Sequence, residues 1–143
     1  MFDEANPAVQ KHLEILQSII DRMALNSSNC KTWCITIVSA ILALAYQQNS
    51  TTISNLAYIP LLLFFFLDSY YLSIERNLRN EFGEFVTALH KGSLNKEQIY
   101  QLEIRSNFFH QIAQTLKTAF SSASILPFYG VFICLVIIST IVK

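Results

Sequence analysis

The sequence predicts an all-α integral membrane protein: a helical hairpin plus a C-terminal helix, with about three transmembrane spans and long helices that extend into the cytoplasm. Two runs contain no Asp, Glu, Lys or Arg, one from Thr32 to Leu67 and one from Thr118 to Val142. About 20 apolar residues are enough to cross a bilayer as a helix. The composition agrees, because 52% of the residues are hydrophobic and only 14% are charged, against about 25% charged in a typical soluble domain. No segment has strand-like alternation, so helical spans are expected.

Residues 1–31 are expected to form an amphipathic helix on the cytoplasmic side. Asn6 is a suitable N-cap, and Pro7 is a suitable first helical residue. Apolar residues then recur at helical spacing, namely Leu13, Leu16, Ile19, Ile20 and Met23. No Gly or Pro follows before Tyr46, so this helix is expected to continue directly into the first span.

Residues 32–72 are expected to form the transmembrane hairpin. The first span covers Thr32–Tyr46, and the polar run Gln47–Thr52 is the place for a turn. The second span covers Ile53–Leu72. Pro60 predicts a kink in it, because proline removes a backbone donor from the helix.

Residues 73–118 are expected to form a cytoplasmic helical segment, and residues 119–143 the C-terminal transmembrane helix. The run His90–Gly92 is a helix stop signal, with cations in the last turn followed by glycine. Asn95, followed by Gln three residues later, predicts the cap of a further helix. That helix is expected to pass toward the last span, Ser124–Val142.

Lys and Arg are distributed unevenly between the two ends of the predicted spans. Three lie in the N-terminal segment, six lie between Ser73 and Thr118, and none lies in the turn. The positive-inside rule therefore places the N-terminus and the long connection in the cytoplasm. Trp33, beside Lys31, fits an interfacial anchor. A formal net charge of zero gives no case for nucleic-acid binding or for a polybasic lipid anchor.

Asp68 is the most informative single residue, because a carboxylate near a membrane span is costly. Asp68, Tyr71, Glu75 and Arg79 are spaced so that they follow one face of a helix. Two interpretations remain open. The stripe is either an interfacial anchor in which Glu75 pairs with Arg79, or a face directed at an oligomer axis or a neighbouring subunit.

One side of the first span carries small and polar residues, namely Asn26, Asn29, Thr32, Thr36, Ser39 or Ala40, and Ala43. Residues of this kind let helices approach closely and form hydrogen bonds across the contact. Two interpretations stay open here also. The face either packs against other helices of the same chain or borders a water-filled passage in an assembly.

Arg105 and His110 match the R-x4-H spacing of HEPN-type ribonucleases. Two side chains five residues apart on a helix point about 140° apart, and the chain holds no second copy of the motif. A shared active site would therefore need a partner subunit. An enzyme is not the preferred prediction, and a ribonuclease with this catalytic pair is the weaker alternative.

No other motif predicts chemistry, a metal or a cofactor. The sequence contains no Gly-rich phosphate loop and no H-E-x-x-H. Cys30, Cys34 and Cys134 are interpreted as small membrane residues, because no partner pair is spaced to complete a metal site. His12 and His90 are interpreted as solvent-exposed residues on helices.

Two segments carry a resemblance to a known family. The first contains Ile20-Asp21-Arg22-Met23-Ala24, Asn26-Ser27 and Lys31-x-Trp33, and the second contains Phe66-Leu67-Asp68-Ser69-Tyr70-Tyr71-Leu72, Glu75-Arg76 and Arg79. Together they resemble small bacterial membrane proteins found beside antiviral defence genes, in particular the accessory membrane proteins of type VI-B (Cas13b) CRISPR systems. That family is described as carrying a divergent HEPN-like pair, which Arg105 and His110 match. The resemblance implies a ring-shaped pore in the bacterial inner membrane that depolarises the cell once the RNA-guided nuclease is triggered.

Three functions follow as hypotheses. The first is a homo-oligomeric pore or membrane-depolarising effector in antiviral defence, with other copies of the chain and the bilayer as partners, functional coupling to an RNA-guided nuclease, and no direct nucleic-acid binding. The second is the membrane-tethered ribonuclease, and the third is a passive membrane anchor for a partner protein. The residues expected at the pore or the oligomer contact are polar or aromatic: Asn26, Asn29, Trp33, Thr36, Asp68, Tyr71, Glu75, Arg76 and Arg79.

Overall fold

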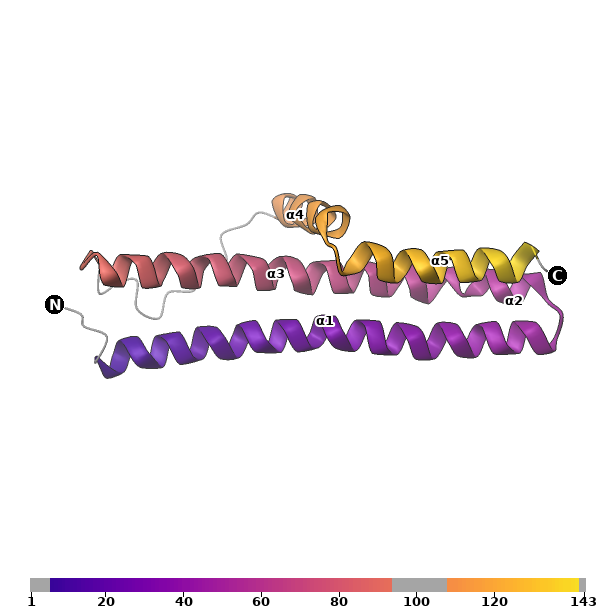
Figure 1. Ribbon diagram of the computed structural model, residues 1–143, viewed down its shortest axis with the longest axis horizontal. Coiled ribbons are helices and arrows are strands. Elements are labelled where there is room, and N and C mark those ends of the chain that lie inside the picture. The colour runs from indigo at the N-terminus through magenta and orange to yellow at the C-terminus, as the bar shows by residue number, and fades with distance from the viewer. Residues whose placement is uncertain (1–5, 94–107, 142–143) are drawn as a thin grey trace.

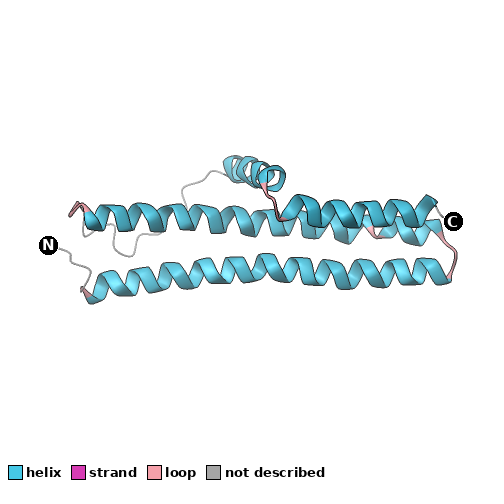
Figure 2. Cartoon of the chain, in the orientation of Figure 1, coloured by secondary structure: helices cyan, strands magenta, loops and turns pink. Residues whose placement is uncertain are grey.

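Helices make up nearly all of the chain that the computed structural model describes, which is residues 6–93 and 108–141, with side chains at 6–93 and 111–141 (Figure 2). The elements are α1 (Pro7–Gln47), α2 (Thr51–Leu56), α3 (Tyr58–His90), α4 (Phe108–Ser121) and α5 (Ile125–Ile141). No strand occurs among these residues, so the all-α prediction is confirmed for them. The helix start predicted at Asn95 lies outside the described residues.

The frame of the fold is an antiparallel hairpin in which α1 and α3 pack along their length (Figure 1). The predicted N-cap of α1 is present, since Asn6 Oδ1 accepts a hydrogen bond from the Ala8 amide at 2.9 Å. The predicted turn follows α1, and Asn49 adopts a φ of 49° there, a left-handed conformation that asparagine tolerates. The predicted stop is also present, because Gly92 has a φ of 65° just after α3.

The returning arm of the hairpin is interrupted near the predicted kink at Pro60. Only Ala57 separates α2 from α3, and its amide bonds to the Ser54 carbonyl at 3.1 Å. Because proline has no N–H, the carbonyl of Leu56 loses its usual partner four residues later. The break therefore lies just before the proline, and the two pieces together still form one 40-residue helical stretch, Thr51–His90.

The connection from α4 to α5 is sharply bent, whereas the sequence predicted a helix that simply passes into the last span. The two helices meet at 74°. Ser122 explains the break, because its Oγ accepts hydrogen bonds from the amides of Ser124 at 3.3 Å and Ile125 at 3.4 Å. A side chain that accepts these bonds begins a new helix instead of extending the old one.

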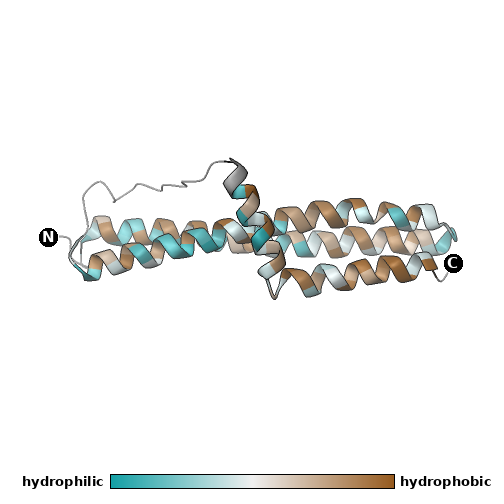
Figure 3. Cartoon of the chain, turned by 90° about the horizontal axis from the view of Figure 1, so that it is seen from above, coloured by the Kyte–Doolittle hydropathy of each residue, from teal (hydrophilic) through white to brown (hydrophobic). Residues whose placement is uncertain are grey.

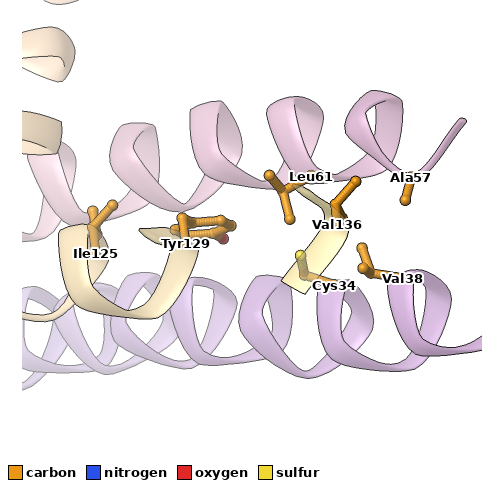
Figure 4. Close-up of a cluster of buried hydrophobic side chains, with 7 residues drawn as sticks. All are labelled: Cys34, Val38, Ala57, Leu61, Ile125, Tyr129 and Val136. Carbon is orange, nitrogen blue, oxygen red and sulfur yellow. The ribbon is translucent and has the colours of Figure 1, made fainter. Parts of the chain in front are cut away.

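The hairpin has two halves of different character, which Figure 3 shows by hydropathy. We call residues 7–31 and 68–90 the polar half, and residues 32–67 and 125–141 the apolar half. Helix α5 lies alongside the hairpin only in the apolar half (Figure 1). Each half has its own buried apolar side chains. In the polar half they are Val9, Phe85 and Leu89, and then Leu16, Ile20 and Leu78; in the apolar half they are Cys34, Val38, Ala57, Leu61, Ile125, Tyr129 and Val136 (Figure 4).

The outer surface separates the two halves more clearly than the core does. In the polar half only one large hydrophobic side chain is strongly exposed among the described residues, that of Leu25. In the apolar half the exposed large hydrophobic residues are Trp33, Ile35, Ile37, Leu44, Tyr46, Leu56, Ile59, Leu62, Leu63, Phe66, Leu126, Val131, Ile133, Leu135, Ile137, Ile138 and Ile141. A patch of this extent marks a surface covered by lipid or protein.

Within residues 6–93 and 108–141, two helical stretches are long and apolar enough to cross a membrane, Pro7–Gln47 and Thr51–His90. The bent pair of α4 and α5 makes a third candidate if it is counted as one span. The prediction of about three spans is thus confirmed only in part, as two to three helices of sufficient length and hydropathy among the described residues.

His12 corrects the sequence interpretation, which placed it on a solvated face. The residue is only 4% exposed, and its ring lies 4.5 Å from the ring of Phe85, centroid to centroid. Burial lowers the pKa of the His12 imidazole below its ordinary value, because desolvation disfavours the charged form. His90, in contrast, is exposed as expected.

Candidate functional site: a boundary cluster and an outward stripe on α1

A small group of polar side chains is buried where the polar half meets the apolar half. Asp68 of α3 is fully buried. Ser27 of α1 donates a hydrogen bond from its Oγ to Asp68 Oδ1. The ammonium of Lys31 donates to the same Oδ1 at 2.9 Å and lies 2.7 Å from Oδ2. Ser27, Lys31 and Asp68 therefore tie α1 to α3, and we call them the boundary cluster.

The cluster is balanced in charge, which is what allows a carboxylate to be buried at this position. The Asp68 side chain has no exposed area, while the Lys31 side chain keeps 20% of its own. Removing one partner of a buried ion pair leaves the other uncompensated and costs about 3–5 kcal/mol. The cluster therefore fixes how far α1 can slide along α3.

Lys31 and Ser27 are functional candidates that the sequence interpretation missed as partners of Asp68. Lys31 and Asp68 are almost equally far along the chain from Asn49, at the turn. In a closed hairpin such residues lie opposite each other, as Val38 and Leu61 also do in the core. Symmetry about the predicted turn was therefore a signal that could have found the pair.

Tyr129 of α5 extends the cluster toward the apolar core. Its ring packs edge-on against Phe65 at 5.3 Å and Phe128 at 4.9 Å, centroid to centroid, and it lies beside Ile125 and Cys34 (Figure 4). The residue is 2% exposed, and its hydroxyl has no hydrogen-bond partner among the described residues. Cys34 is three residues after Lys31 and Phe65 is three residues before Asp68, so Tyr129 of α5 packs about one helical turn from the ion pair between α1 and α3.

The second feature is the outward face of α1 from the last turn of the polar half through the apolar half. Five of its residues are small or polar and exposed, and we call them the α1 stripe: Asn29, Thr32, Thr36, Ala40 and Ala43. At about 100° per residue they lie opposite the buried residues Cys34, Val38 and Ala45. Packing within one chain, one of the two interpretations of this face, therefore does not hold for these residues.

The hydroxyl groups of the stripe are partly satisfied by their own helix. Thr36 Oγ1 donates to the Thr32 carbonyl at 3.0 Å, and Thr32 Oγ1 donates to the Ser28 carbonyl at 3.3 Å. Each hydroxyl oxygen still presents acceptor capacity outward. Ser39 is exposed beside the stripe. Together these groups form a narrow band of oxygen atoms on an otherwise apolar surface.

The other outward faces of the apolar half are built differently. On α3 the exposed residues include Ile59, Leu62 and Leu63, which keep 66%, 63% and 56% of their area. On α5 they include Val131 at 58% and Ile138 at 54%. Bulky aliphatic side chains suit contact with lipid, whereas small and hydroxyl residues suit contact between helices.

The remaining predicted site residues lie around these two features. Asn26 is half-buried next to the boundary cluster in sequence, and Trp33 is 60% exposed beside the α1 stripe. Glu75 and Arg79 form the ion pair expected for an anchor, with 2.8 Å between Arg79 Nε and Glu75 Oε1. Arg76 donates a hydrogen bond to Ser121 Oγ of α4 at 3.4 Å.

The stripe predicted on α3 does not form a single outward face. Tyr71 is half-buried and Arg79 is exposed, whereas Asp68 points at α1 of its own chain. The structure thus brings Asp68 together with Ser27 and Lys31, and it leaves Asn29 and Thr36 on the opposite side of α1. The predicted residues accordingly divide between two separate places.

Catalytic and metal-binding features do not gather in the described part of the chain. Arg105 lies outside it, and the side chain of His110 is not described. Cys30 and Cys34 are buried as free thiols, and Cys134 is exposed. Residues 6–93 and 108–141 contain no group of three or more His, Cys, Asp or Glu side chains that could hold a metal.

Comparison with protein-family models, with curated proteins and with solved structures finds no match to this chain. The boundary cluster can hold the hairpin in register and can release it if the ion pair is broken. The α1 stripe can accept another helix or border water, because its side chains are small and its oxygen atoms face outward.

Proposed function

We propose that the apolar half of this chain is inserted in a bilayer and that copies of the chain assemble around their α1 stripes into a homo-oligomeric pore, which depolarises the membrane when it opens. The single observation that carries the proposal is the contrast between the outward faces of the apolar half. The outward side of α1 carries the small and polar α1 stripe between exposed bulky residues such as Trp33 and Leu44, whereas α3 and α5 expose mainly bulky aliphatic residues. Such a subunit would contact its neighbours or water through the α1 stripe, and lipid through its other exposed apolar surfaces.

The dimensions of the α1 stripe suit this role. From Asn29 to Ala43, and on to the exposed Gln47 at the end of α1, the helix rises about 27 Å. The hydrocarbon core of a bilayer is about 30 Å thick. The described residues 6–93 and 108–141 offer at most three spans, which cannot enclose a passage, so the pore requires several copies.

The setting that we propose is antiviral defence at the bacterial inner membrane, with the N-terminus in the cytoplasm. The resemblance in the segments around Asp21 and Asp68 to accessory membrane proteins of type VI-B CRISPR systems supports it. Depolarisation would then follow activation of an RNA-guided nuclease. The chain would need no cofactor and no direct contact with nucleic acid for this.

Cross-linking tests the assembly. In a background with Cys30, Cys34 and Cys134 replaced by Ala, Ala40→Cys places a thiol on the α1 stripe, and Leu62→Cys places a matched thiol on the bulky face of α3. Oxidation in native membranes is expected to give dimers of the Ala40→Cys chain and few of the Leu62→Cys chain. The detergent-extracted particle is expected to be a closed ring. A monomeric particle without Ala40→Cys cross-links would end the pore proposal.

Membrane potential tests the activity. A potential-sensitive dye would be followed in bacteria that contain the chain, the RNA-guided nuclease and its target RNA. Depolarisation is expected with the wild-type chain and with the control Ile37→Leu. It is expected to be lost with Thr36→Leu, which fills the stripe with a bulky side chain. A preserved potential in triggered cells that carry the wild-type protein in their membrane would contradict the proposal.

A further inference from the structure

Helix α4 differs from the other helices in its position and direction. It lies across the hairpin, between the polar half and the apolar half (Figure 3), and it is bent by 74° from α5. It is strongly amphipathic. Its 14 residues would rise only about 21 Å even if they stood upright, so α4 does not cross a bilayer by itself.

One edge of α4 is packed on the rest of the chain and is made of small residues. Thr115, Thr118 and Ala119 are buried there. Thr115 Oγ1 donates to the Gln111 carbonyl at 2.8 Å, so its hydroxyl is satisfied within the helix. Among the described side chains of α4, Gln114, Leu116, Lys117 and Phe120 lie outside this edge.

The second edge is polar and is bonded to the polar half. Gln114 Oε1 accepts a hydrogen bond from Asn77 Nδ2 at 2.9 Å, and Ser121 Oγ accepts one from Arg76 at 3.4 Å. Asn77 and Arg76 follow Asp68 on α3 and therefore lie on the side of the boundary cluster that belongs to the polar half. This edge is directed toward the predicted cytoplasmic side.

The third edge is apolar and exposed. Leu116 keeps 45% of its area and Phe120 keeps 69%. At about 100° per residue these two side chains lie about 100° to 160° around α4 from Gln114 and Ser121. Because the polar edge is directed at the polar half, the apolar edge is directed at the apolar half. Leu126, just past the bend at the start of α5, is 44% exposed, so exposed apolar residues occur on both sides of the bend.

We infer that α4 is an interfacial helix that binds the lipid surface of the cytoplasmic leaflet, with Leu116 and Phe120 in the outer part of the acyl chains and the polar edge among the headgroups. The occupant of the apolar edge is lipid because exposed apolar residues occur on both sides of the bend, at the level where the charged residues begin. Arg76 and Lys117 are exposed at this level, where cations can pair with lipid phosphates. The inference rests on the membrane insertion proposed above.

Tryptophan fluorescence in proteoliposomes tests the inference. Trp33 is the single tryptophan, so a Trp33→Phe background gives a chain that is silent until one reporter is added. Phe120→Trp reports the apolar edge of α4, and Lys117→Trp is the matched control on the exposed polar side. Val131→Trp, on the exposed face of α5, reports whether the apolar half is in lipid at all.

Lipids brominated on their acyl chains are expected to quench Phe120→Trp and Val131→Trp strongly. Aqueous acrylamide is expected to quench Lys117→Trp strongly and the other two weakly. If Val131→Trp is quenched by lipid and Phe120→Trp only by acrylamide, the inference about α4 fails while insertion stands. Protection of Phe120→Trp from both quenchers would mean that protein covers the edge, as a passive docking helix requires, and would also overturn it. Lack of lipid quenching at Val131→Trp would refute insertion itself.

Discussion

The polar half and the apolar half of the hairpin have cores of the same kind but opposite surfaces. In both halves α1 buries one apolar stripe against α3, with Leu16 and Ile20 in the polar half and Cys34 and Val38 in the apolar half. On the outward side of α1 the last exposed charged residue is Arg22, and the chain carries no charge at all from Thr32 to Leu67. The inner pattern therefore determines the fold, and the outer pattern determines the surroundings that each half requires.

The comparison is tested first at the boundary cluster, where the two halves meet and where a substitution is expected to lower stability strongly. Asp68→Ala leaves the Lys31 ammonium without its carboxylate, and we expect it to lower the free energy of unfolding by about 3 kcal/mol, the low end for a buried pair because Lys31 is partly exposed. The measurement is equilibrium unfolding in mixed micelles of sodium dodecyl sulfate and a mild detergent, followed by circular dichroism.

A double substitution serves as the control for this effect. Asp68→Leu with Lys31→Met replaces both charges by apolar groups of similar size, which is often neutral or stabilising for a buried pair. We expect the double variant to be more stable than Asp68→Ala. If the two variants lose the same stability, the ion pair does not hold the two halves in register.

A second prediction compares the loss of stability when a buried leucine is truncated in each of the two cores. Leu78 of the polar half and Leu61 of the apolar half are both buried, at 3% and 1% exposure. Leu78→Ala is expected to cost about 2–5 kcal/mol, because it loses both transfer energy and packing. Leu61→Ala is expected to cost at most about 2 kcal/mol, since lipid is as apolar as leucine and only packing is lost.

The same mixed-micelle unfolding measures both leucine variants. Leu78→Met and Leu61→Met, which nearly conserve volume, are the matched controls and should each cost little. Equal losses for the two alanine variants would indicate that the apolar half is surrounded by something other than lipid or detergent.

Much of this architecture is readable in the sequence, for identifiable physical reasons. The charge-free runs of the sequence identify the apolar half, because charged side chains are costly in an apolar environment. Asn6, Gly92 and the turn around Asn49 mark the ends of the helices because these residue types suit capped or left-handed backbone. Such local signals place both ends of α1 and the C-terminal end of α3 without any knowledge of their contacts, whereas the division of the returning arm into α2 and α3 was expected only as a kink at Pro60.

The contacts between helices are harder to read. The polar spacing on α3 makes Asp68 conspicuous, but only the register of the hairpin shows that Ser27 and Lys31 meet it. The small residues of the α1 stripe fit either an inward or an outward face, because close packing and exposure to a neighbour favour the same residue types. The bend before α5 depends on hydrogen bonds to Ser122, a residue common in continuing helices as well.

His12 shows why a lone titratable residue is misread, and it provides the smallest expected effect. A histidine flanked by ordinary helix residues resembles a solvated one until the partner helix is placed, and here that helix brings Phe85 onto its ring. Burial lowers the pKa of His12 in the folded chain below the ordinary 6.5, so the unfolded chain binds a proton at a higher pH than the folded chain does. The contribution to stability is therefore complete above about pH 6.5 and declines as the pH falls below it.

This pH effect is expected in the polar half and not in the apolar half. Hydrogen exchange of the backbone amides, measured in micelles at pH 7.5 and pH 5.5 and corrected for intrinsic rates, should show faster opening at the lower pH in the region around Val9, His12 and Phe85. The segment around Val38 should change little, since it contains no titratable histidine. His12→Phe keeps an aromatic ring against Phe85 and should remove the pH-dependent difference near position 12. A difference that persists in His12→Phe would assign the effect to other groups, because protonation of this imidazole would then have no part in loosening the polar half.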